Sequence, residues 1–552
     1  MGDRSVTRNC GPDLVRVGAG LPVAAYRDEI TTALHGGRAV IVAPPGTGKT
    51  TFVPPLVASR CSGRVIVTQP RRVAARAAAR RLATLTGTRP GEFASHTVHG
   101  ESTTTRDTKV EFVTTGVLLR RLLSDPDLTG VDAVVLDEVH ERHLDADLVV
   151  AMVCEVAQLR DDLTIVAMSA TVDSSGWAAF LGGVEPAPVV EVASALHELE
   201  VEWAPAAGAA VESRGVSREF LGHLGTVTVD ALDRHTEGSA LVFVPGAREV
   251  DHVVADLRSR LAGIDVVGLS GAMSAREQDH ALSDPGNVRR VIVATAVAES
   301  SLTVPGVRLV VDSGLSREPR LDRGRGMTGL VTVRESRASA VQRAGRAARL
   351  GPGVAVRCMR AQDWAGMNAD PTPEVDHADL VASLLSLAVW GSPRGEGMAL
   401  PTPLPQDRVA AAEEELRDLG AVDAEGRITA RGRHLATFPL DPRLARALTD
   451  GAAIIGSRRC AEIAAMLGLE DGQVDFVGQW RQLRSGRHPE AAMWRREADR
   501  LARLINDVPP TDITDDDAVA TVVSLARPGW IARSRGVGST SYLLACGTGV
   551  DL

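Results

Sequence analysis

Residues 38–51 read RAVIVAPPGTGKTT, and this stretch decides how the first part of the chain folds. The apolar residues 39–43 predict a short buried strand, and the segment 44–48, PPGTG, predicts a tight loop before a helix that begins at Lys49. Glycines let backbone N–H groups turn toward an anion at a helix N-terminus, so this order indicates a phosphate-binding loop. Ala43 replaces the first glycine of the usual pattern, so the strict motif is not met.

Two polar residues at the end of this loop are expected to bind the nucleotide and its metal ion. Lys49 is expected to reach the β- and γ-phosphates of a nucleotide, and the Thr50 hydroxyl is expected to coordinate Mg²⁺. The alternative is a turn that merely contains GTGK, and the strand and helix on either side argue against it. The expected nucleotide contacts are Pro45, Gly46, Thr47, Gly48, Lys49, Thr50 and Thr51.

Composition limits the classes that the chain can belong to. The 552 residues suffice for several domains, and the six cysteines contain no CxxC pair that would indicate zinc. No apolar run is long enough to span a membrane and the N-terminus has no signal-peptide pattern, so we expect a cytoplasmic protein. The net charge of −9 means that a nucleic acid would need a local channel. Lys49 and Lys109 are the only lysines, so the presence of a lysine in the loop is a stronger indication of phosphate binding.

Further strands alternate with helices along the first half of the chain. After an expected helix over residues 21–35, strands are predicted at residues 39–43, 64–68, 110–114, 133–136 and 164–168. Polar motifs follow these strands: Arg71 and Arg72, then Thr114, Thr115 and Gly116, then Asp137 and Glu138, then Ser169 and Thr171. Ligands of parallel α/β sheets bind at the carboxyl ends of strands, where all these motifs lie.

A second set of strands follows a looser stretch at residues 188–215. Strands are predicted at residues 240–244, 265–269, 290–294 and 308–311, and a helix is predicted at 339–350. This half repeats the first architecture without a phosphate loop of its own.

The order of these motifs resembles that of the DEAH-box group of superfamily 2 helicases, and within it the bacterial HrpB type. The segments that carry the resemblance are APPGTGKT, TQPRRVA, TTG, DEVH, SAT, LVFVPG, TAVAESSLT and QRAGRAAR. Three positions depart from the usual motifs, namely Val139, Ala296 and Ala348. The first is a neutral exchange, and the other two are expected to weaken nucleotide or nucleic-acid contacts without removing catalytic groups.

The chemistry of triphosphate hydrolysis assigns roles to the DEVH motif. Asp137 is expected to hold Mg²⁺, and Glu138 is expected to act as the general base or to orient the water. The alternative is that the two carboxylates only cap a helix. The resemblance implies that His140 couples this motif to the second domain.

Arginines of the last motif are expected to complete the site. Arg346 and Arg349 are three apart, so one helical face would aim both at the γ-phosphate, and Gln342 would help to place the water. A solvated basic helix is the alternative, above all for Arg343. The resemblance implies that Arg81 stacks on adenine opposite Leu282, which would permit broad NTP use. Ser169 and Thr171 are expected to link hydrolysis to domain motion.

Nucleic-acid contacts are expected at strand-end loops. The resemblance assigns the phosphate backbone to Arg71, Arg72, Thr114, Thr115, Gly116 and Thr295, and it implies a strand-separating hairpin at residues 317–327. Hydroxyl groups, backbone N–H groups and arginines suit sequence-independent binding. RNA as the polymer rests on the family alone.

The resemblance also implies the architecture: two RecA-like parallel-sheet α/β domains in tandem, followed by a mainly helical winged-helix and ratchet-like region. The expected boundaries are 1–188, 189–360, 361–441, 442–510 and 511–552. The last segment resembles only the beginning of the HrpB-type C-terminal region, and we expect a truncated chain.

The sequence thus predicts a 3′-to-5′ helicase or translocase that uses ATP and Mg²⁺ and binds single-stranded nucleic acid, most readily RNA. No membrane partner is expected, and no protein partner can be named. Two alternatives stay open: a DNA-acting translocase of the same superfamily, and an ATP-gated clamp or scaffold that does not unwind.

Overall fold

The computed structural model describes residues 12–551 apart from 171–173, 194–196, 214, 272, 285, 287, 300–303, 323–326 and 470–474. The chain forms two compact units. The first comprises Met1–Pro319, Leu330–Glu374 and Ala399–Thr402, and it contains two large sheets. The second comprises Arg320–Gly329, Val375–Met398 and Pro403–Leu552, and it is mainly helical.

The first sheet has eight strands in the order β4-β3-β5-β2-β6-β7-β1-β8. All neighbouring strands are parallel except β3 and β4. The strands are β1 (Arg38–Val42), β2 (Arg64–Gln69), β3 (Ala94–Val98), β4 (Glu101–Ser102), β5 (Val110–Thr114), β6 (Val131–Leu136), β7 (Thr164–Ser169) and β8 (Val189–Glu191). The helices of this part are α1 (Leu14–Gly18), α2 (Arg27–Ala33), α3 (Lys49–Ala58), α4 (Arg72–Thr86), α5 (Thr115–Ser124), α6 (Leu144–Leu159) and α7 (Ser174–Gly182).

The five strands predicted for this half are confirmed, each to within two residues. The edge strands β4 and β8, and β3 next to β4, were not predicted. Strand β8 pairs with β1, so the first sheet extends beyond residue 188, where a boundary was expected. The predicted single helix over residues 21–35 is wrong, because a 3-10 turn at Pro22–Tyr26 precedes α2, which ends at Ala33.

The second sheet has six parallel strands in the order β13-β14-β12-β15-β18-β9. They are β9 (Leu199–Trp203), β12 (Ser239–Phe243), β13 (Asp265–Leu269), β14 (Arg290–Ala294), β15 (Val307–Asp312) and β18 (Gly353–Arg357). Its helices are α8 (Arg218–Arg234), α9 (Ala247–Arg260), α10 (Ala275–Leu282), α11 (Arg337–Ala344) and α12 (Ala361–Ala365). The four predicted strands are confirmed, whereas β9 and β18 were missed.

The strands predicted from apolar runs form the cores of the two sheets. Val40, Ile41 and Ile66 are fully buried in the first sheet, as are Leu241 and Val242 in the second. Burying a side chain of this size contributes roughly 1.5–3 kcal/mol, so the strands are fixed by their apolar residues and polar groups collect at the strand ends.

Helix α11 is shorter than predicted. It ends at Ala344, where Gly345 caps it, and the chain continues in turns held by the bonds from Arg346 N to Arg343 O and from Ala347 N to Ala344 O. The predicted helix over 339–350 is therefore wrong in its second half, and Arg346 and Arg349 do not share a helical face.

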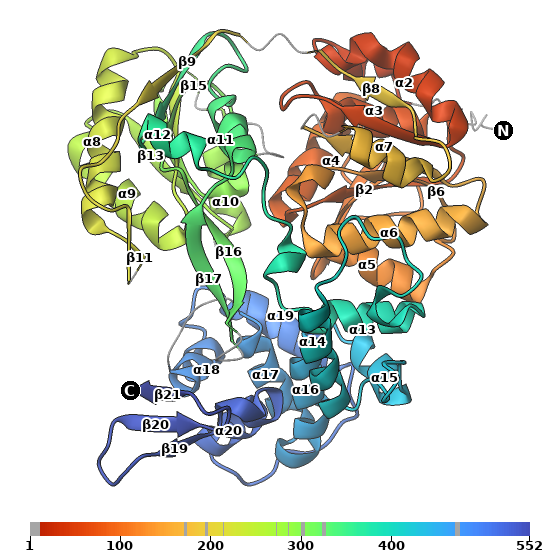
Figure 1. Ribbon diagram of the computed structural model, residues 1–552, viewed down its shortest axis with the longest axis vertical. Coiled ribbons are helices and arrows are strands. Elements are labelled where there is room, and N and C mark those ends of the chain that lie inside the picture. Colours follow the sequence, from red (N-terminus) through yellow and green to blue (C-terminus); the bar gives the residue numbers. More distant parts are fainter. Residues whose placement is uncertain are drawn as a thin grey trace, which may run out of the picture. The chain divides into compact units, whose positions relative to one another are not determined.

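The second unit is built from helices (Figure 1). They are α13 (Val381–Trp390), α14 (Gln406–Asp418), α15 (Ala430–Thr437), α16 (Pro442–Ile455), α17 (Ser457–Leu467), α18 (Phe476–Ser485), α19 (Ala491–Ala502) and α20 (Asp515–Ala526). Part of the acidic segment 511–517 opens α20, because Thr514 caps this helix and three aspartates form its first turn.

Several short β elements complete the fold. The strands β16 (Leu315–Asp322) and β17 (Met327–Arg334) form the hairpin expected at residues 317–327, whose tip lies outside the described residues. The strands β10 (Val211–Glu212) and β11 (Gly215–Val216) pair with each other, as do β19 (Ala532–Ser534), β20 (Ser541–Leu544) and β21 (Gly549–Asp551). Among the described residues, no helix is long and apolar enough to cross a membrane.

Candidate nucleotide site

The loop between β1 and α3 has the backbone that its glycines predict. Gly46 and Gly48 have φ values of 91° and 88°, a left-handed conformation that other residues adopt only with strain. In the described part of the chain, neither N–H group donates to another backbone group. Thr47 is fully buried, and its hydroxyl donates to Pro44 O at 2.8 Å, so this side chain supports the loop instead of facing a ligand.

Two carboxylates from the end of β6 meet the first residues of α3. Lys49 Nζ lies 2.9 Å from Glu138 Oε2, and both side chains are 5% exposed. The Thr50 hydroxyl donates to Asp137 Oδ2 at 2.6 Å, and the Gln69 amide donates to the same oxygen at 2.7 Å. The structure therefore brings together the two segments that the sequence placed at separate strand ends, and it adds Gln69, which was not predicted.

Burial and mutual repulsion act on this carboxylate pair. Burial, followed by the neighbouring charge of Glu138, raises the pKa of Asp137. Burial opposes the charge of Glu138 too, but Lys49 and then His140 outweigh it and lower the pKa of Glu138. Glu138 also has a φ of 55°, unusual for a residue with a side chain, and such strain is common at functional sites.

His140 connects the DEVH motif to two other motifs. Its Nδ1 accepts a hydrogen bond from Ala170 N at 3.2 Å, and its Nε2 lies 2.7 Å from the Gln342 amide. The Gln342 atom in this contact is its amide nitrogen, Nε2. Burial lowers the pKa of His140, which favours the neutral imidazole. The contact with Gln342 supports the coupling role expected of His140. It also occupies the Gln342 side chain, which was expected to help to place the water.

Two arginines of the last motif lie in the site although they lie beyond α11. Arg346 is 3% exposed, and its Nε donates to Glu299 O at 3.0 Å. A Cβ atom built on Gly46 would lie 3.2 Å from Cδ of Arg349, so this side chain covers the loop. Burial lowers the pKa of Arg349 to about 10, and burial, followed by Arg349 itself, lowers the pKa of Arg346.

Arg349 provides the test of whether a nucleotide fits. Its Nε and Nη2 atoms are buried without a hydrogen-bond partner among the residues that the structure describes. Unsatisfied buried donors are costly, and phosphate oxygens would satisfy them. The N–H groups of Gly46 and Gly48 belong to this loop and Lys49 follows it directly, so the donor set suits a polyphosphate. Thr50 and Asp137 offer the oxygen ligands that Mg²⁺ prefers.

The positions assigned to nucleic acid lie at strand ends, in varied environments. Arg71 Nη1 lies 3.1 Å from Glu141 Oε1, an ion pair that the sequence did not predict. Arg72 begins α4 and is exposed. Thr114 caps α5, Thr115 is buried in its first turn, Gly116 lies near Asp145, and Thr295 N donates to Leu269 O.

The remaining predicted residues have separate outcomes. Arg81 is exposed on α4, while its neighbour Arg80 pairs with Asp279 at 2.7 Å. Ser169 ends β7 and is fully buried, and its carbonyl oxygen accepts from Ala43 N at 3.0 Å. Thr171 lies outside the described residues.

Three family models match the chain. A DEAD/DEAH box helicase model matches residues 26–177, a helicase conserved C-terminal domain model matches 224–351, and a winged-helix helicase-associated domain (HA2) model matches 412–440. The last match confirms the expected winged-helix region.

The chain is also similar to characterised proteins. It is 36% identical over 545 residues to the ATP-dependent RNA helicase HrpB of Escherichia coli, a match that covers 96% of this chain and 64% of that protein. It is 32% identical over 477 residues to the probable ATP-dependent RNA helicase DHX35 homolog of Caenorhabditis elegans, covering 84% of this chain and 64% of that protein. A crystal structure of the E. coli DEAH/RHA helicase HrpB superimposes with a TM-score of 0.84 at 34% identity, over 96% of this chain and 66% of that chain. The chain therefore spans just under two thirds of the length of these relatives.

Proposed function

Because the chain belongs to the DEAD/DEAH-box helicases, we propose that it is a cytoplasmic, ATP-dependent translocase that moves 3′-to-5′ along single-stranded RNA and separates strands. The observation that carries the proposal is the convergence of Lys49 and Thr50 with Glu138 and Asp137 at 2.9 and 2.6 Å. The resemblance supplies the direction, and the relatives, each named as an established or probable RNA helicase, favour RNA.

The loop residues bind the phosphates. Gly46 and Gly48 offer backbone N–H groups, and Lys49 exchanges its partner Glu138 for the β- and γ-phosphates. Mg²⁺, held through Thr50 and Asp137, would neutralise phosphate charge. The exchange matters because it frees the Glu138 carboxylate at the moment when a substrate is bound.

Glu138 then orients the attacking water and accepts its proton. Arg346 and Arg349 stabilise the negative charge that spreads over the transferred phosphoryl group. His140 and Gln342 transmit the state of this site between the two sheets, since their side chains meet at 2.7 Å. Each cycle of binding and hydrolysis would thereby change how the loops at the strand ends hold the RNA backbone.

Strand displacement tests this proposal. RNA duplexes that carry a 3′ or a 5′ single-stranded overhang are incubated with the full chain and ATP, beside DNA duplexes of the same sequence and the variant Glu138→Gln. The expected result is displacement of the 3′-overhang RNA duplex by the unaltered chain alone. Displacement of DNA only would support a DNA translocase, and RNA-stimulated hydrolysis without displacement would support an ATP-gated clamp.

A further inference from the structure

A polar cavity lies where the strands of the first sheet begin, at the end of the sheet opposite the phosphate-binding loop. Its volume is about 640 Å³, and it lies beside Arg64 and Val131, which begin β2 and β6. All strands of a parallel sheet start at the same end of the sheet and finish at the other end. The phosphate-binding loop follows the last residue of β1, at the end where the strands finish. The cavity is therefore separate from the nucleotide site.

Basic side chains dominate the lining of this cavity. Arg64, Arg106, Lys109 and Arg121 face two carboxylates, Asp107 and Asp125. The lining carries two more positive than negative charges, and the buried Glu111 beneath it pairs with Arg64 and Arg121, so that Arg106 and Lys109 remain for a ligand. This local excess contrasts with the net charge of −9 on the whole chain. Lys109 is one of only two lysines in the chain, and the other is Lys49 of the phosphate-binding loop.

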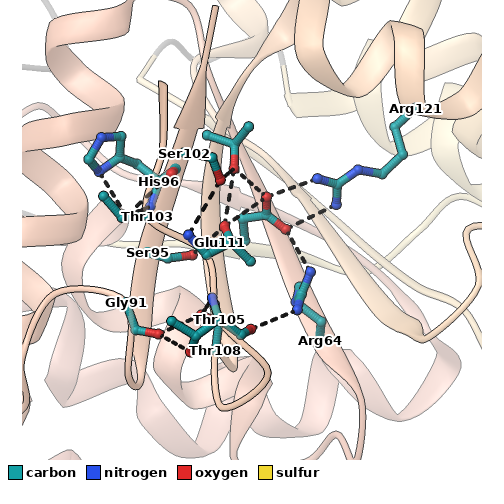
Figure 2. A network of polar contacts seen from close by, with 12 residues as sticks. Arg64, Gly91, Ser95, His96, Ser102, Thr103, Thr105, Thr108, Glu111 and Arg121 are labelled. Carbon is teal, nitrogen blue, oxygen red and sulfur yellow. Dashed lines mark hydrogen bonds and ion pairs between the residues drawn. The ribbon is translucent and has the colours of Figure 1, made fainter. Parts of the chain in front are cut away.

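A buried carboxylate fixes two of the arginines. Figure 2 shows Arg64 and Arg121 converging on Glu111, whose side chain is 1% exposed. Arg64 Nη1 lies 3.1 Å from Glu111 Oε2, and the two terminal nitrogens of Arg121 lie 3.0 and 2.8 Å from the two carboxylate oxygens. Burial opposes the charge of Glu111, but Arg121 outweighs it and lowers the pKa of Glu111. The guanidinium groups are thus held in place before any ligand arrives.

The loops that form the walls are held as well. Arg64 Nη2 donates to Thr105 O at 3.2 Å, and Thr129 donates through its backbone N–H to Asp125 at 2.8 Å (Figure 2 shows the first of these contacts). Arg160 donates to the carbonyl oxygens of Asp127 and Val131 at 2.8 and 3.1 Å. A cavity whose walls are fixed in this way binds a ligand at a lower entropic cost.

Donor capacity is left over inside this frame. Arg64 Nε is buried without a hydrogen-bond partner among the described residues. Lys109 Nζ donates to Ser62 O at 2.5 Å, and an ammonium group has two further donors. An anion with several oxygen atoms would satisfy donors that the protein itself leaves open.

We propose that this cavity binds a small anion that carries more than one phosphate group, such as a diphosphate ester. Several cations surround one space, so a ligand with more than one negative charge is favoured, and Arg and Lys side chains suit phosphate oxygens. The volume lies within the range of roughly 300–1,000 Å³ that is typical of small-molecule sites. The proposal stands apart from the proposed helicase activity, because no residue of the cavity belongs to the nucleotide site.

The scarcity of lysine permits a direct test with pyrophosphate as the probe. Reductive methylation with isotope-labelled formaldehyde keeps the charge of a lysine and gives one NMR signal each for Lys49, Lys109 and the N-terminal amine. The nucleotide site is first saturated with Mg²⁺ and a non-hydrolysable ATP analogue, and pyrophosphate is then added. The expected result is a saturable shift of the Lys109 signal while the Lys49 signal stays still. A repeat in the Lys49→Ala variant gives an independent reading that does not require the analogue.

Matched variants show whether the cavity itself is responsible. Arg106→Gln removes one lining charge without touching the pairs of Glu111, and it is expected to weaken pyrophosphate binding about tenfold. Arg89→Gln removes an arginine whose side chain is 88% exposed outside the lining, and it is expected to leave binding unchanged. Equal weakening by both variants, or no saturable shift of Lys109, would overturn the proposal. A shift produced by single-stranded RNA but not by pyrophosphate would overturn it too.

Discussion

The two sheets of the first unit each contain a strand, a Pro-Gly loop and a helix, and only one of the two loops is open to a ligand. After β1, the N–H groups of Gly46 and Gly48 donate to no backbone group of the described residues, and Arg349, which covers the loop, has two buried donors without a partner among those residues. After β12, a Cβ atom on Gly246 would lie 2.5 Å from Glu249 Oε2 and 2.7 Å from Cζ of Arg317. The second loop is thus filled by an ion pair of its own, whose charged atoms are 3.1 Å apart.

The comparison separates stability from function. In the second loop Glu249 and Arg317 pair with each other, so the loop contributes to a stable fold, although Glu249 Oε2 and Arg317 Nε have no hydrogen-bond partner among the described residues. In the first loop Arg349 is buried with no ion pair and with two open donors among the described residues, which costs stability while no phosphate is bound. Four experiments test this difference between the two loops.

The largest effect is expected from Lys49→Ala. Removing the ammonium deprives the phosphates of their main cation and leaves Glu138 buried without its partner, so kcat for ATP hydrolysis should fall at least about a thousandfold. Steady-state phosphate release measures this. Hydrolysis within tenfold of the unaltered chain would show that the open loop is not the site of chemistry.

Arg349→Leu should lower the rate of ATP hydrolysis while it stabilises the ligand-free protein. We expect kcat to fall about a hundredfold, because one of two cations that face the transferred phosphoryl group is lost. The ligand-free protein should become more stable by about 1 kcal/mol, because a buried guanidinium with open donors is replaced by an apolar side chain. Denaturant unfolding without nucleotide measures the second effect, and a clear loss of stability would contradict the account.

Glu249→Gln should give the opposite result in the filled loop. Its charge pairs with Arg317, so the free energy of unfolding should fall by about 1 kcal/mol, while hydrolysis should stay within about twofold. The same two assays as for Arg349 apply. A large loss of hydrolysis with unchanged stability would mean that the second loop takes part in the chemistry.

The smallest effect concerns pH and a completed ion pair in the second unit. The hydrogen bond from Arg394, helped by Arg417 and opposed by burial, lowers the pKa of Glu413 from 4.5 to about 2. A depressed carboxyl pKa contributes stability that is present above pH 4.5 and is lost as the pH falls toward about 2. After solvent screening of the half-exposed arginines, this amounts to about 1 kcal/mol. Glu413→Gln should flatten the acid side of the pH–stability profile, and an unaltered slope would contradict the assignment.

Apolar runs made the buried strands predictable, because central strands of a parallel sheet are apolar on both faces. The strands β3, β8 and β9 were missed, since they lie at or next to sheet edges and carry polar or exposed residues. The end of α11 was misjudged because Gly345 caps the helix although the pattern of residues continues beyond it.

The site was predictable where a motif fixes the chemistry. Lys49, Thr50, Asp137 and Glu138 lie at strand ends, and parallel strands bring such ends together. Partners that depend on the three-dimensional arrangement were not predictable, as with Gln69 on Asp137 and Glu141 on Arg71. The motif predicted that Arg349 would point at the γ-phosphate, whereas its position against Gly46 and its open donors appear only in the structure.

Whether Glu138 is the base of an RNA-coupled ATPase is tested most directly by steady-state ATP hydrolysis with and without single-stranded RNA, for the unaltered chain and for Glu138→Gln. We expect RNA to stimulate hydrolysis by the unaltered chain, and we expect the variant, which keeps the shape of the side chain but removes its basicity, to lose hydrolysis under both conditions. Full hydrolysis by Glu138→Gln would contradict the assigned base, and equal rates with and without RNA would contradict the coupling of this site to nucleic acid.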